Sequence, residues 1–445
     1  MLSVGLSTRL VMFKTIRILF LLGLLIAAFS SIEAQAANST VDVLHAKGII
    51  NPVLVDYIER GIEHAEETNA IACIIQLDTP GGLDTSMRDI VQDIVNSRVP
   101  VVVFVSPAGA RAASAGVFIT VAAHVAVMAP NTAIGAAHPV LISGEGEAAM
   151  SEAMEEKVVN DAAAYIRSIA EAHGRNMEWA EKAVRESVSA TEKEALEMNV
   201  IDMVAPDVDA LILMLDGREV TMLGGAVVTL NTKGATINHV PMNTIEDFLY
   251  AISDPNIAYL LLSLATLGIM AEITNPGLIF PGVIGVICLL MAFLSLGMLP
   301  VNYAGILLIV LAFGLFIAEA FTASFGLFTA GGITALVLGS LILFKGGPLF
   351  RVNPWLIGAV SIIIAGVVVF IMSRVIRAHH RQASTGWEEL IGKPAVVKAA
   401  LAPEGMVLFR GERWKAVSEE GTIEPGGEVI INRVENLRLY VTKKG

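Results

Sequence analysis

One stretch of this sequence limits the fold more than any other: in residues 255–344, only Glu272 and Glu319 are charged. A helix of about 20 apolar residues is long enough to cross the hydrocarbon core of a bilayer. We therefore predict an α-helical transmembrane region over residues 255–376, with four or five spans because the first segment is short enough to be re-entrant. Proline and glycine divide the region into five apolar segments, which are Ile257–Ile273, Leu278–Leu299, Ala304–Phe321, Phe325–Phe344 and Trp355–Val375.

Basic residues indicate which side of the membrane the last segment faces. Arg374, Arg377 and Arg381 form the clearest basic cluster in the chain, and such clusters favour the cytoplasmic side. An odd number of spans then joins an exported N-terminal part to a cytoplasmic C-terminal part, although Lys345 and Arg351 would lie outside. Four spans with an external C-terminus is the alternative.

The first 37 residues have the three parts of a secretory signal. A basic region precedes the apolar run Ile18–Phe29, and Ala34-Gln35-Ala36 fits a small-residue cleavage site. An uncleaved signal anchor is the other interpretation of residues 1–37. Either one exports the domain that comes after it, so we predict a multi-pass cell (inner) membrane protein whose residues 38–240 are extracytoplasmic.

Residues 38–240 alternate apolar strand-like runs with helical patterns. Continuous apolar strands are typical of parallel sheets that are buried on both faces, so the order of elements predicts an α/β fold with right-handed crossovers. The stretch LDGREVTMLGG predicts a hairpin around its Asp-Gly pair. The expected strands are Val41–Ala46, Ile71–Leu77, Val99–Val105 and His124–Met128, and the expected helices are Pro52–Thr68, Leu83–Asn96, Glu152–His173 and Glu192–Val204, the last running into a short strand.

Charge and cysteine content narrow the function classes. Residues 38–240 hold 13 Lys and Arg against 28 Asp and Glu, a net charge of −15. Such a surface repels nucleic acid and anionic lipid headgroups, so nucleic acid is not an expected partner. Membrane lipid is expected as a partner because of the apolar segments. Cys73 and Cys288 lie in separate apolar runs, and no disulfide is expected.

Residues 386–445 contain five short alternating runs separated by glycine-bearing turns, which predicts a small all-β barrel of the OB type. Nine basic and nine acidic residues cancel in this segment. It therefore lacks the positive charge of a nucleic-acid-binding domain, and we interpret it as an interaction module.

The run SPAGARAASAG at residues 106–116 carries one serine among small residues. Ser114 follows a buried strand, with an expected loop over Ser106–Ala113 between them, and opens the helix-like run Ala115–Ala123. The N-terminus of that helix would stabilise negative charge beside the hydroxyl. A helix N-cap serine is also common for structural reasons alone. Close packing of membrane helices is the other use of small residues, but Arg111 and the position in an exported domain disfavour it.

A second motif, Asp78-Thr79-Pro80-Gly81-Gly82, ends the preceding buried strand. Its glycines let bare backbone approach a ligand. Together with the N–H of Ala115, the N–H groups of Gly81 and Gly82 would form an oxyanion hole. The plainer alternative is a tight strand-to-helix turn.

A serine nucleophile needs a base, and two residues compete for that role. Lys157 lies on the helix expected over Glu152–His173, whose apolar packing stripe consists of Val158, Ala162, Tyr165 and Ile169. A lysine buried near an apolar cleft can act as a base near neutral pH; the ordinary alternative for Lys157 is a salt bridge to Asp161. His138 in GAAHPV suits the role without a large pKa change. The sequence shows no metal-ligand cluster and no phosphate-binding loop, so neither a metal nor a cofactor is expected.

Taken together, DTPGG, SPAGARAASAG, NTAIGAAHPV (131–140) and KVVNDAAAYIRSIAEAHGRN (157–176), followed by apolar spans and a small barrel, resemble the long-form NfeD proteins. These are membrane-bound serine proteases with a ClpP-like, crotonase-type domain, also called stomatin-operon partner proteins. The resemblance covers nearly the whole chain after the signal.

This resemblance implies roles for individual residues. It implies that Ser114 is the nucleophile and Lys157 the base of a Ser-Lys dyad, with Gly81 and Gly82 as the family's glycine pair. ClpP peptidases instead use a histidine about two dozen positions after the serine, and His138 lies 24 positions on. A Ser-His mechanism therefore stays open.

The resemblance also implies a partner: a stomatin- or prohibitin-like membrane protein, cleaved in its apolar segments, with the barrel used for contact and a homo-oligomeric assembly. Two rival functions remain. One is a non-enzymatic scaffold for stomatin-like proteins, which would not need both Ser114 and Lys157. The other is a crotonase-type acyl-CoA enzyme, which the acidic surface and the export of the domain disfavour.

Overall fold

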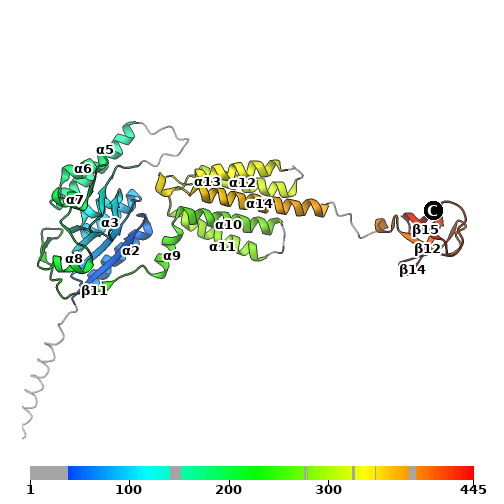
Figure 1. Cartoon of the computed structure of the whole chain (residues 1–445), viewed down its shortest axis with the longest axis horizontal. Coiled ribbons are helices and arrows are strands. Elements are labelled where there is room, and N and C mark those ends of the chain that lie inside the picture. The colour runs from blue at the N-terminus through cyan, green and yellow to red at the C-terminus, as the bar shows by residue number, and fades with distance from the viewer. Residues whose placement is uncertain are drawn as a thin grey trace, which may run out of the picture. The chain divides into compact units, whose positions relative to one another are not determined.

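The computed structural model describes residues 39–140, 152–274, 277, 279–322, 326–345, 347–379 and 387–444 (Figure 1). The predicted signal at residues 1–37 lies outside the described residues. Two compact units are present, one formed by the chain up to residue 317 with residues 330–362, the other by residues 318–329 with residue 363 onward. Each unit is described by itself.

A six-stranded, all-parallel sheet is the centre of the first unit, as the continuous apolar runs predict. The pairing register aligns Leu44 of one strand with Ile75 of the next, and Ile75 with Val103 of the third. All three side chains are fully buried. In spatial order the strands are β11 (Thr236–His239), β1 (Thr40–Lys47), β2 (Ala72–Asp78), β3 (Val101–Val105), β5 (Val125–Met128) and β8 (Met203–Val204).

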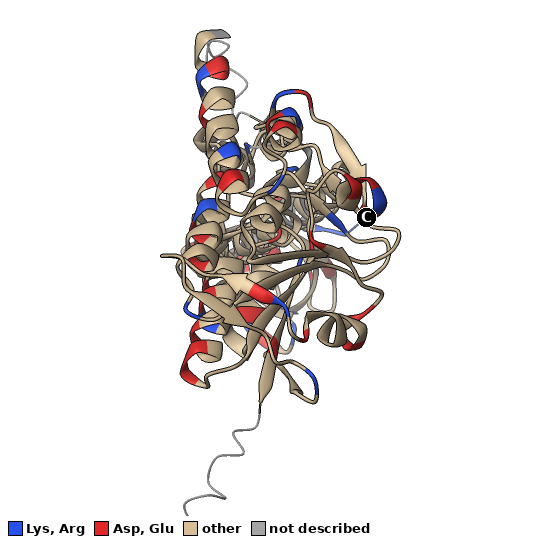
Figure 2. Ribbon diagram, turned by 90° about the vertical axis from the view of Figure 1, so that its left-hand side faces the viewer, with Lys and Arg blue, Asp and Glu red and all other residues tan. Residues whose placement is uncertain are grey.

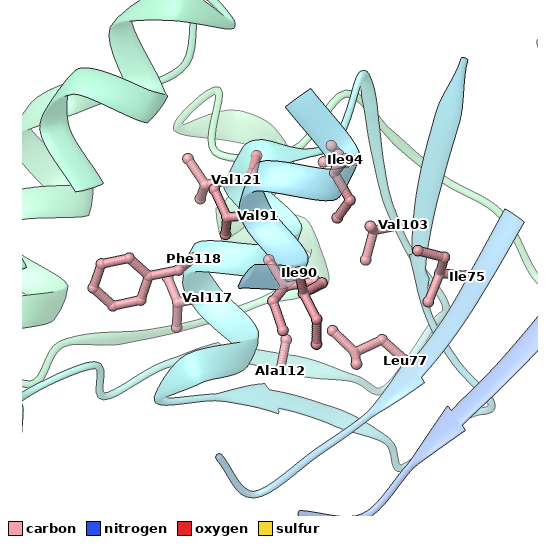
Figure 3. Packing of buried hydrophobic residues seen from close by; sticks show 14 of the residues in the cluster. Ile75, Leu77, Ile90, Val91, Ile94, Val103, Ala112, Val117, Phe118 and Val121 are labelled. Carbon is pink, nitrogen blue, oxygen red and sulfur yellow. The ribbon is translucent and has the colours of Figure 1, made fainter. Parts of the chain in front are cut away.

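Helices join these strands and build a large core on one face of the sheet. Figure 3 shows part of this core, where apolar side chains of β2, β3, α3 and α4 meet. A second core on the other face includes Leu211 and Leu215 of α8 (Val208–Leu215). The helices that contribute to the first core include α2 (Pro52–Glu67), α3 (Asp84–Asn96), α4 (Ala115–Ala122), α5 (Glu152–Ala172) and α6 (Met177–Arg185).

A smaller sheet that sequence patterns did not reveal lies beside the main one. It consists of β4 (Arg111–Ala113), β6 (Ala133–Gly135) and β7 (Ser189–Thr191). Each strand has three residues, too few to show an apolar alternation. The segment 106–113, expected as a loop, therefore contains a strand because long-range pairing creates it.

Two expectations for the end of the domain were only partly right. Of the helix and short strand expected from Glu192 to Val204, the helix ends early, as α7 (Glu192–Glu197), and the strand is present as β8 (Met203–Val204). The expected hairpin exists as β9 (Glu219–Thr221) and β10 (Val227–Thr229), but its turn is not the Asp-Gly pair. Gly224 and Gly225 have φ of 87° and 84° and form the turn, because only this pair lies between the two strands.

Five apolar helices follow α9 (Thr244–Ile252), in the order that the sequence predicts. Two of them, α10 (Pro255–Thr274) and α11 (Ile279–Gly297), are long and apolar enough to cross a membrane. The other three helices are α12 (Tyr303–Phe321), α13 (Leu327–Leu341) and α14 (Pro354–His379). Each contains a shorter apolar stretch, and these stretches are, in the same order, Tyr303–Glu319, Leu327–Leu341 and Pro354–Phe370. The number of spans stays a prediction.

The C-terminal segment forms a closed five-stranded barrel, as its alternating runs predict. Its strands close in the order β12 (Pro394–Ala399), β13 (Glu404–Phe409), β14 (Glu412–Ser418), β16 (Arg438–Lys443) and β15 (Glu428–Glu435). Val397, Val407 and Ile431 are among the fully buried side chains of its core.

Cys73 and Cys288 are free thiols, so no disulfide joins them, as the sequence predicts.

A buried arginine joins two elements of the first unit. The Arg175 guanidinium, 6% exposed, donates to the carbonyls of Val121 and Ala123 at 2.6 and 2.7 Å and to the Asp202 carboxylate at 2.6 Å. Burial, with repulsion by this guanidinium, lowers the pKa of His124 to about 4. Burial and Arg175 likewise lower the pKa of His173 to about 4, and the two rings meet edge to face.

Acid is expected to destabilise the fold through these two histidines. Both stay neutral in the folded chain down to about pH 4, whereas an unfolded histidine binds a proton below about pH 6.5. The free energy of unfolding that these neutral histidines contribute is therefore fully present above pH 6.5. It is lost as the pH falls toward 4, on the order of 3 kcal/mol for each histidine. Thermal unfolding of the full chain between pH 7 and pH 4.5 measures this. A His124→Asn, His173→Gln double variant should show a flatter curve, and an unchanged slope would contradict the assignment.

Candidate functional site

Ser114 lies in a sharp turn between β4 and α4. Its φ is 53° and its ψ is −113°, a conformation that is strained for any residue with a side chain. Strain of this kind persists only where the surroundings determine the backbone on both sides, and it concentrates at functional sites. The nucleophile of α/β-hydrolases occupies the same kind of strained strand-to-helix turn, which exposes its hydroxyl.

The elements on both sides of Ser114 are firmly held. Before it, β4 is paired with β6 on one edge, and on the other edge Thr79 donates to the Arg111 carbonyl at 2.8 Å and accepts from Ala113 at 3.1 Å. After it, every residue of α4 is buried. The fold therefore imposes the strained backbone at Ser114, whose own hydroxyl has no hydrogen-bond partner among the described residues.

Gly81 approaches Ser114 more closely than any residue with a side chain could. A Cβ at position 81 would lie 2.7 Å from the Ser114 Cβ and 3.1 Å from its Oγ, and the φ of Gly81 is +122°. On the α4 side, a Cβ at Gly116 would lie 2.7 Å from the Thr79 Cγ2. The small residues in both motifs thus let the loop 79–82 lie against the start of α4.

Thr79 is a residue of the site that sequence reasoning missed. Its side chain is fully buried, and its Oγ1 accepts from the Gly81 N–H at 3.0 Å and donates to the Gly81 carbonyl at 3.1 Å. A threonine whose hydroxyl bonds the backbone two residues on is a recognised turn signal. The motif DTPGG carries that signal in its threonine.

The backbone donors near Ser114 are not equivalent. The Gly81 N–H is already bonded to Thr79, whereas the N–H groups of Gly82 and Ala115 have no partner among the described residues. In the trans peptide between Gly81 and Gly82, the carbonyl and the N–H point in opposite directions. The Gly81 carbonyl accepts from the Ile50 N–H at 3.0 Å, so the Gly82 N–H points away from Ile50. These two N–H groups are therefore available to a ligand.

Lys157 lies near the start of α5, where residues 153–157 are all exposed. Its expected alternative partner, Asp161, is instead bound to Arg88 of α3 at 2.6 Å, and Lys157 has no ion pair among the described residues. Arg88 also lies over the ring of Tyr165, 4.5 Å from its centroid. The ion pair to Arg88, together with the stacking of Tyr165 on Phe118 of α4, holds α5 against α3 and α4.

No hydrogen bond joins Lys157 to Ser114 among the described residues. Ser114 lies one helical turn before Phe118, and Lys157 lies about two turns, or roughly 12 Å of helix, before Tyr165, which stacks on Phe118. The apolar stripe expected for α5 is partly buried, with Ala162 and Ile169 in the core.

His138 is half-buried, and its ring has a defined orientation. Its Nδ1 lies 2.8 Å from the Val184 carbonyl, so Nδ1 carries the proton and donates. The neutral ring then presents Nε2 as an acceptor. His138 thus has the tautomer that a base requires, although no contact with Ser114 is present.

A pocket of about 520 Å³ lies at the end of β4 that is farther from Ser114. Its lining combines the charged residues Arg111, Glu192 and Lys193 with Asn131. The domain as a whole carries the surplus of acidic residues that the sequence indicates (Figure 2).

Three protein-family models match consecutive parts of the chain. The NfeD1b N-terminal domain matches residues 40–240, the NfeD integral membrane domain matches 256–374, and the NfeD-like C-terminal, partner-binding domain matches 388–443. Together they match each of the three regions that the sequence distinguishes beyond residues 1–37.

Known proteins resemble the chain over nearly its whole length. The membrane-bound protease PH1510 of Pyrococcus horikoshii is 39% identical over 433 residues, which are 95% of this chain and 98% of that protein. A solved structure of the 1510-N membrane-bound stomatin-specific protease, a lysine-to-alanine mutant with a substrate peptide, is 36% identical and covers 48% of this chain and 98% of its own, with a TM-score of 0.45. A serine-to-alanine mutant of the same protease is 38% identical and covers 46% and 99%, with a TM-score of 0.43.

Proposed function

This chain belongs to the NfeD family and is a membrane-bound serine protease, and we propose that it cleaves apolar segments of membrane proteins with a dyad of Ser114 and Lys157. The observation that carries the proposal is the strained turn at Ser114, with Gly81 packed against its side chain. The elements on both sides of Ser114 hold this strained conformation although the strain lowers the stability of the fold. Such strain is expected at a nucleophile and not at an ordinary helix cap.

In the proposed mechanism, the Ser114 Oγ attacks the scissile carbonyl while Lys157 takes the hydroxyl proton. The same amine later protonates the leaving nitrogen, so that one group acts as base and then as acid. We assign the oxyanion to the N–H groups of Gly82 and Ala115. The Gly81 N–H, expected from the sequence as a third donor, would have to leave the Thr79 hydroxyl first.

The exposure of Lys157 gives a reason for apolar substrates. A lysine accepts a proton only when it is neutral, and removal of water favours the neutral form. An apolar segment lying across Ser114 and the start of α5 would cover the amine and so activate it. A polar segment would leave the amine in water, and Ser114 would keep its proton.

His138 is the second candidate for the base. It is favoured by the hydrogen bond from its Nδ1 to Val184, which leaves Nε2 as an acceptor. Under this alternative, activity would not depend on desolvation of an amine.

The relatives' printed names supply the proposed substrate. PH1510 is named a membrane-bound protease and 1510-N a stomatin-specific protease. For this chain we propose a stomatin- or prohibitin-like membrane protein as substrate, contact with a partner through the barrel, a homo-oligomeric assembly, and an extracytoplasmic protease domain with a cytoplasmic barrel.

Substrate preference tests the proposal. The full chain in detergent should cleave a peptide with an apolar core. The same peptide with two lysines beside the scissile bond should react at least about a hundredfold more slowly, because general-base catalysis contributes about 10²–10⁴-fold and would be lost with a hydrated amine. Initial rates of both peptides, with kcat and KM determined separately, measure this. The difference should lie mainly in kcat; equal kcat values would rule out activation by an apolar substrate.

A further inference from the structure

Two histidines lie side by side on the face of the main sheet that carries the second core. His239 of β11 is paired with Val43 of β1, and His45 lies two residues further along β1 on the same face. The Nε2 of His45 and the Nδ1 of His239 are 3.4 Å apart, and the two ring planes are inclined by 13°.

One buried tyrosine holds the backbone of both strands at this point. The fully buried Tyr57 hydroxyl accepts from the His45 N–H at 2.9 Å and donates to the carbonyl of Val240, the residue after His239, at 2.8 Å. The Val240 N–H also donates to the Val43 carbonyl at 3.0 Å. Because these bonds hold the main chain, the separation of the two imidazoles does not depend on flexible loops.

Both imidazoles are available to a ligand. Each is exposed, and neither ring has a side-chain partner other than the other ring among the described residues. Imidazole nitrogens are the commonest protein ligands of metal ions.

The spacing fits a chelated metal ion. Zinc–imidazole bonds are about 2.0–2.1 Å long, so two nitrogens at a tetrahedral angle on one ion are about 3.3–3.4 Å apart. We propose that His45 and His239 chelate a divalent late transition-metal ion, with water completing its coordination. Imidazole ligands suit Zn²⁺, Ni²⁺ and Cu²⁺, with Cu²⁺ bound most tightly. No set of three or more His, Cys, Asp and Glu side chains in the described part of the chain could hold a metal, so this is an exchangeable two-residue site.

Such an ion would reinforce the place where the chain leaves the sheet. β11 is an edge strand, and α9 begins five residues after it ends. α9 is itself tied to α2 by the ion pair of Arg60 with Glu246 at 2.6 Å. A metal bridging β1 and β11 would fasten the edge strand that leads to α9 and the apolar helices.

The test uses the full chain in detergent, purified without a polyhistidine tag and freed of metal. Calorimetric titration with Zn²⁺ and with Ni²⁺ at pH 7.5 is compared for wild type, His45→Ala, His239→Ala and Lys47→Ala. Each histidine variant should bind at least about tenfold more weakly, since even partners of metal ligands contribute 10–100-fold to affinity. Saturating Zn²⁺ should also raise the unfolding temperature of wild type and not that of either histidine variant.

Lys47→Ala is the matched control, because Lys47 lies two residues after His45 on the same strand and face and its side chain is 81% exposed. It should bind metal like wild type. His379 and His380 are present in every variant, so binding there does not affect the comparison. Wild-type affinity in either histidine variant, or loss of affinity in Lys47→Ala equal to that in the histidine variants, overturns the proposal.

Discussion

Ser114→Ala is expected to reduce kcat for an apolar peptide by about 10⁴-fold or more, because removal of a serine nucleophile leaves only binding and oxyanion stabilisation. Alanine has the same backbone restrictions as serine, so the strained turn and the fold should persist. Initial rates with the full chain, together with its unfolding temperature, measure both effects.

Ser168→Ala is the control for this result. Ser168 lies on the exposed side of α5, and its replacement should leave the rate unchanged. Peptide cleavage that survives in purified Ser114→Ala would show that another residue is the nucleophile, and the significance of the turn at Ser114 would then need a structural explanation.

Lys157→Ala should reduce kcat for the apolar peptide nearly as much as Ser114→Ala does, since nucleophile and base act as a unit. Lys157→Arg should be equally inactive, because a guanidinium does not release its proton. Lys182→Ala, which removes an exposed lysine that is paired with Glu178 at 2.7 Å, should retain full activity. The kcat of His138→Ala should fall by less than about tenfold, because His138 is not the base in the proposed dyad.

The pH dependence of the rate distinguishes the two bases. If the substrate desolvates the lysine, the rise of kcat with pH will lie at lower pH than the rise of kcat/KM, because kcat reports the enzyme–substrate complex and kcat/KM the free enzyme. A histidine base would not be activated by desolvation of an amine, so the two rises would lie at the same pH. Loss of activity in His138→Ala but not in Lys157→Ala would assign the base to His138.

Much of the fold could be predicted because its signals are local. The run IACIIQL is a continuous apolar segment, and the strand lies within one residue of the expected position, at Ala72–Asp78. The five alternating runs of the C-terminal segment each became a strand of the barrel. In both cases the side chains that face the core are adjacent or alternate in the sequence, so the pattern of burial can be read directly.

Elements made by distant pairing could not be predicted in this way. β4, β6 and β7 have three residues each, and their apolar content differs little from that of a loop. The hairpin turn was misplaced because both Asp216-Gly217 and Gly224-Gly225 have turn chemistry. The position of the turn depends on the register of the two strands. The Leu230 N–H donates to the Arg218 carbonyl, and this register places Gly224 and Gly225 between the strands.

For the site, the sequence by itself determined the candidate residues and the need for small neighbours around Ser114. Only the tertiary structure decided that the Gly81 backbone lies against the Ser114 side chain, that Thr79 occupies one backbone donor, and that Lys157 is exposed. It also decided that His45 and His239, 194 positions apart, face each other. The reason is physical: residue type and spacing set local conformation, whereas these contacts depend on the register of parallel strands, which core packing over the whole domain selects.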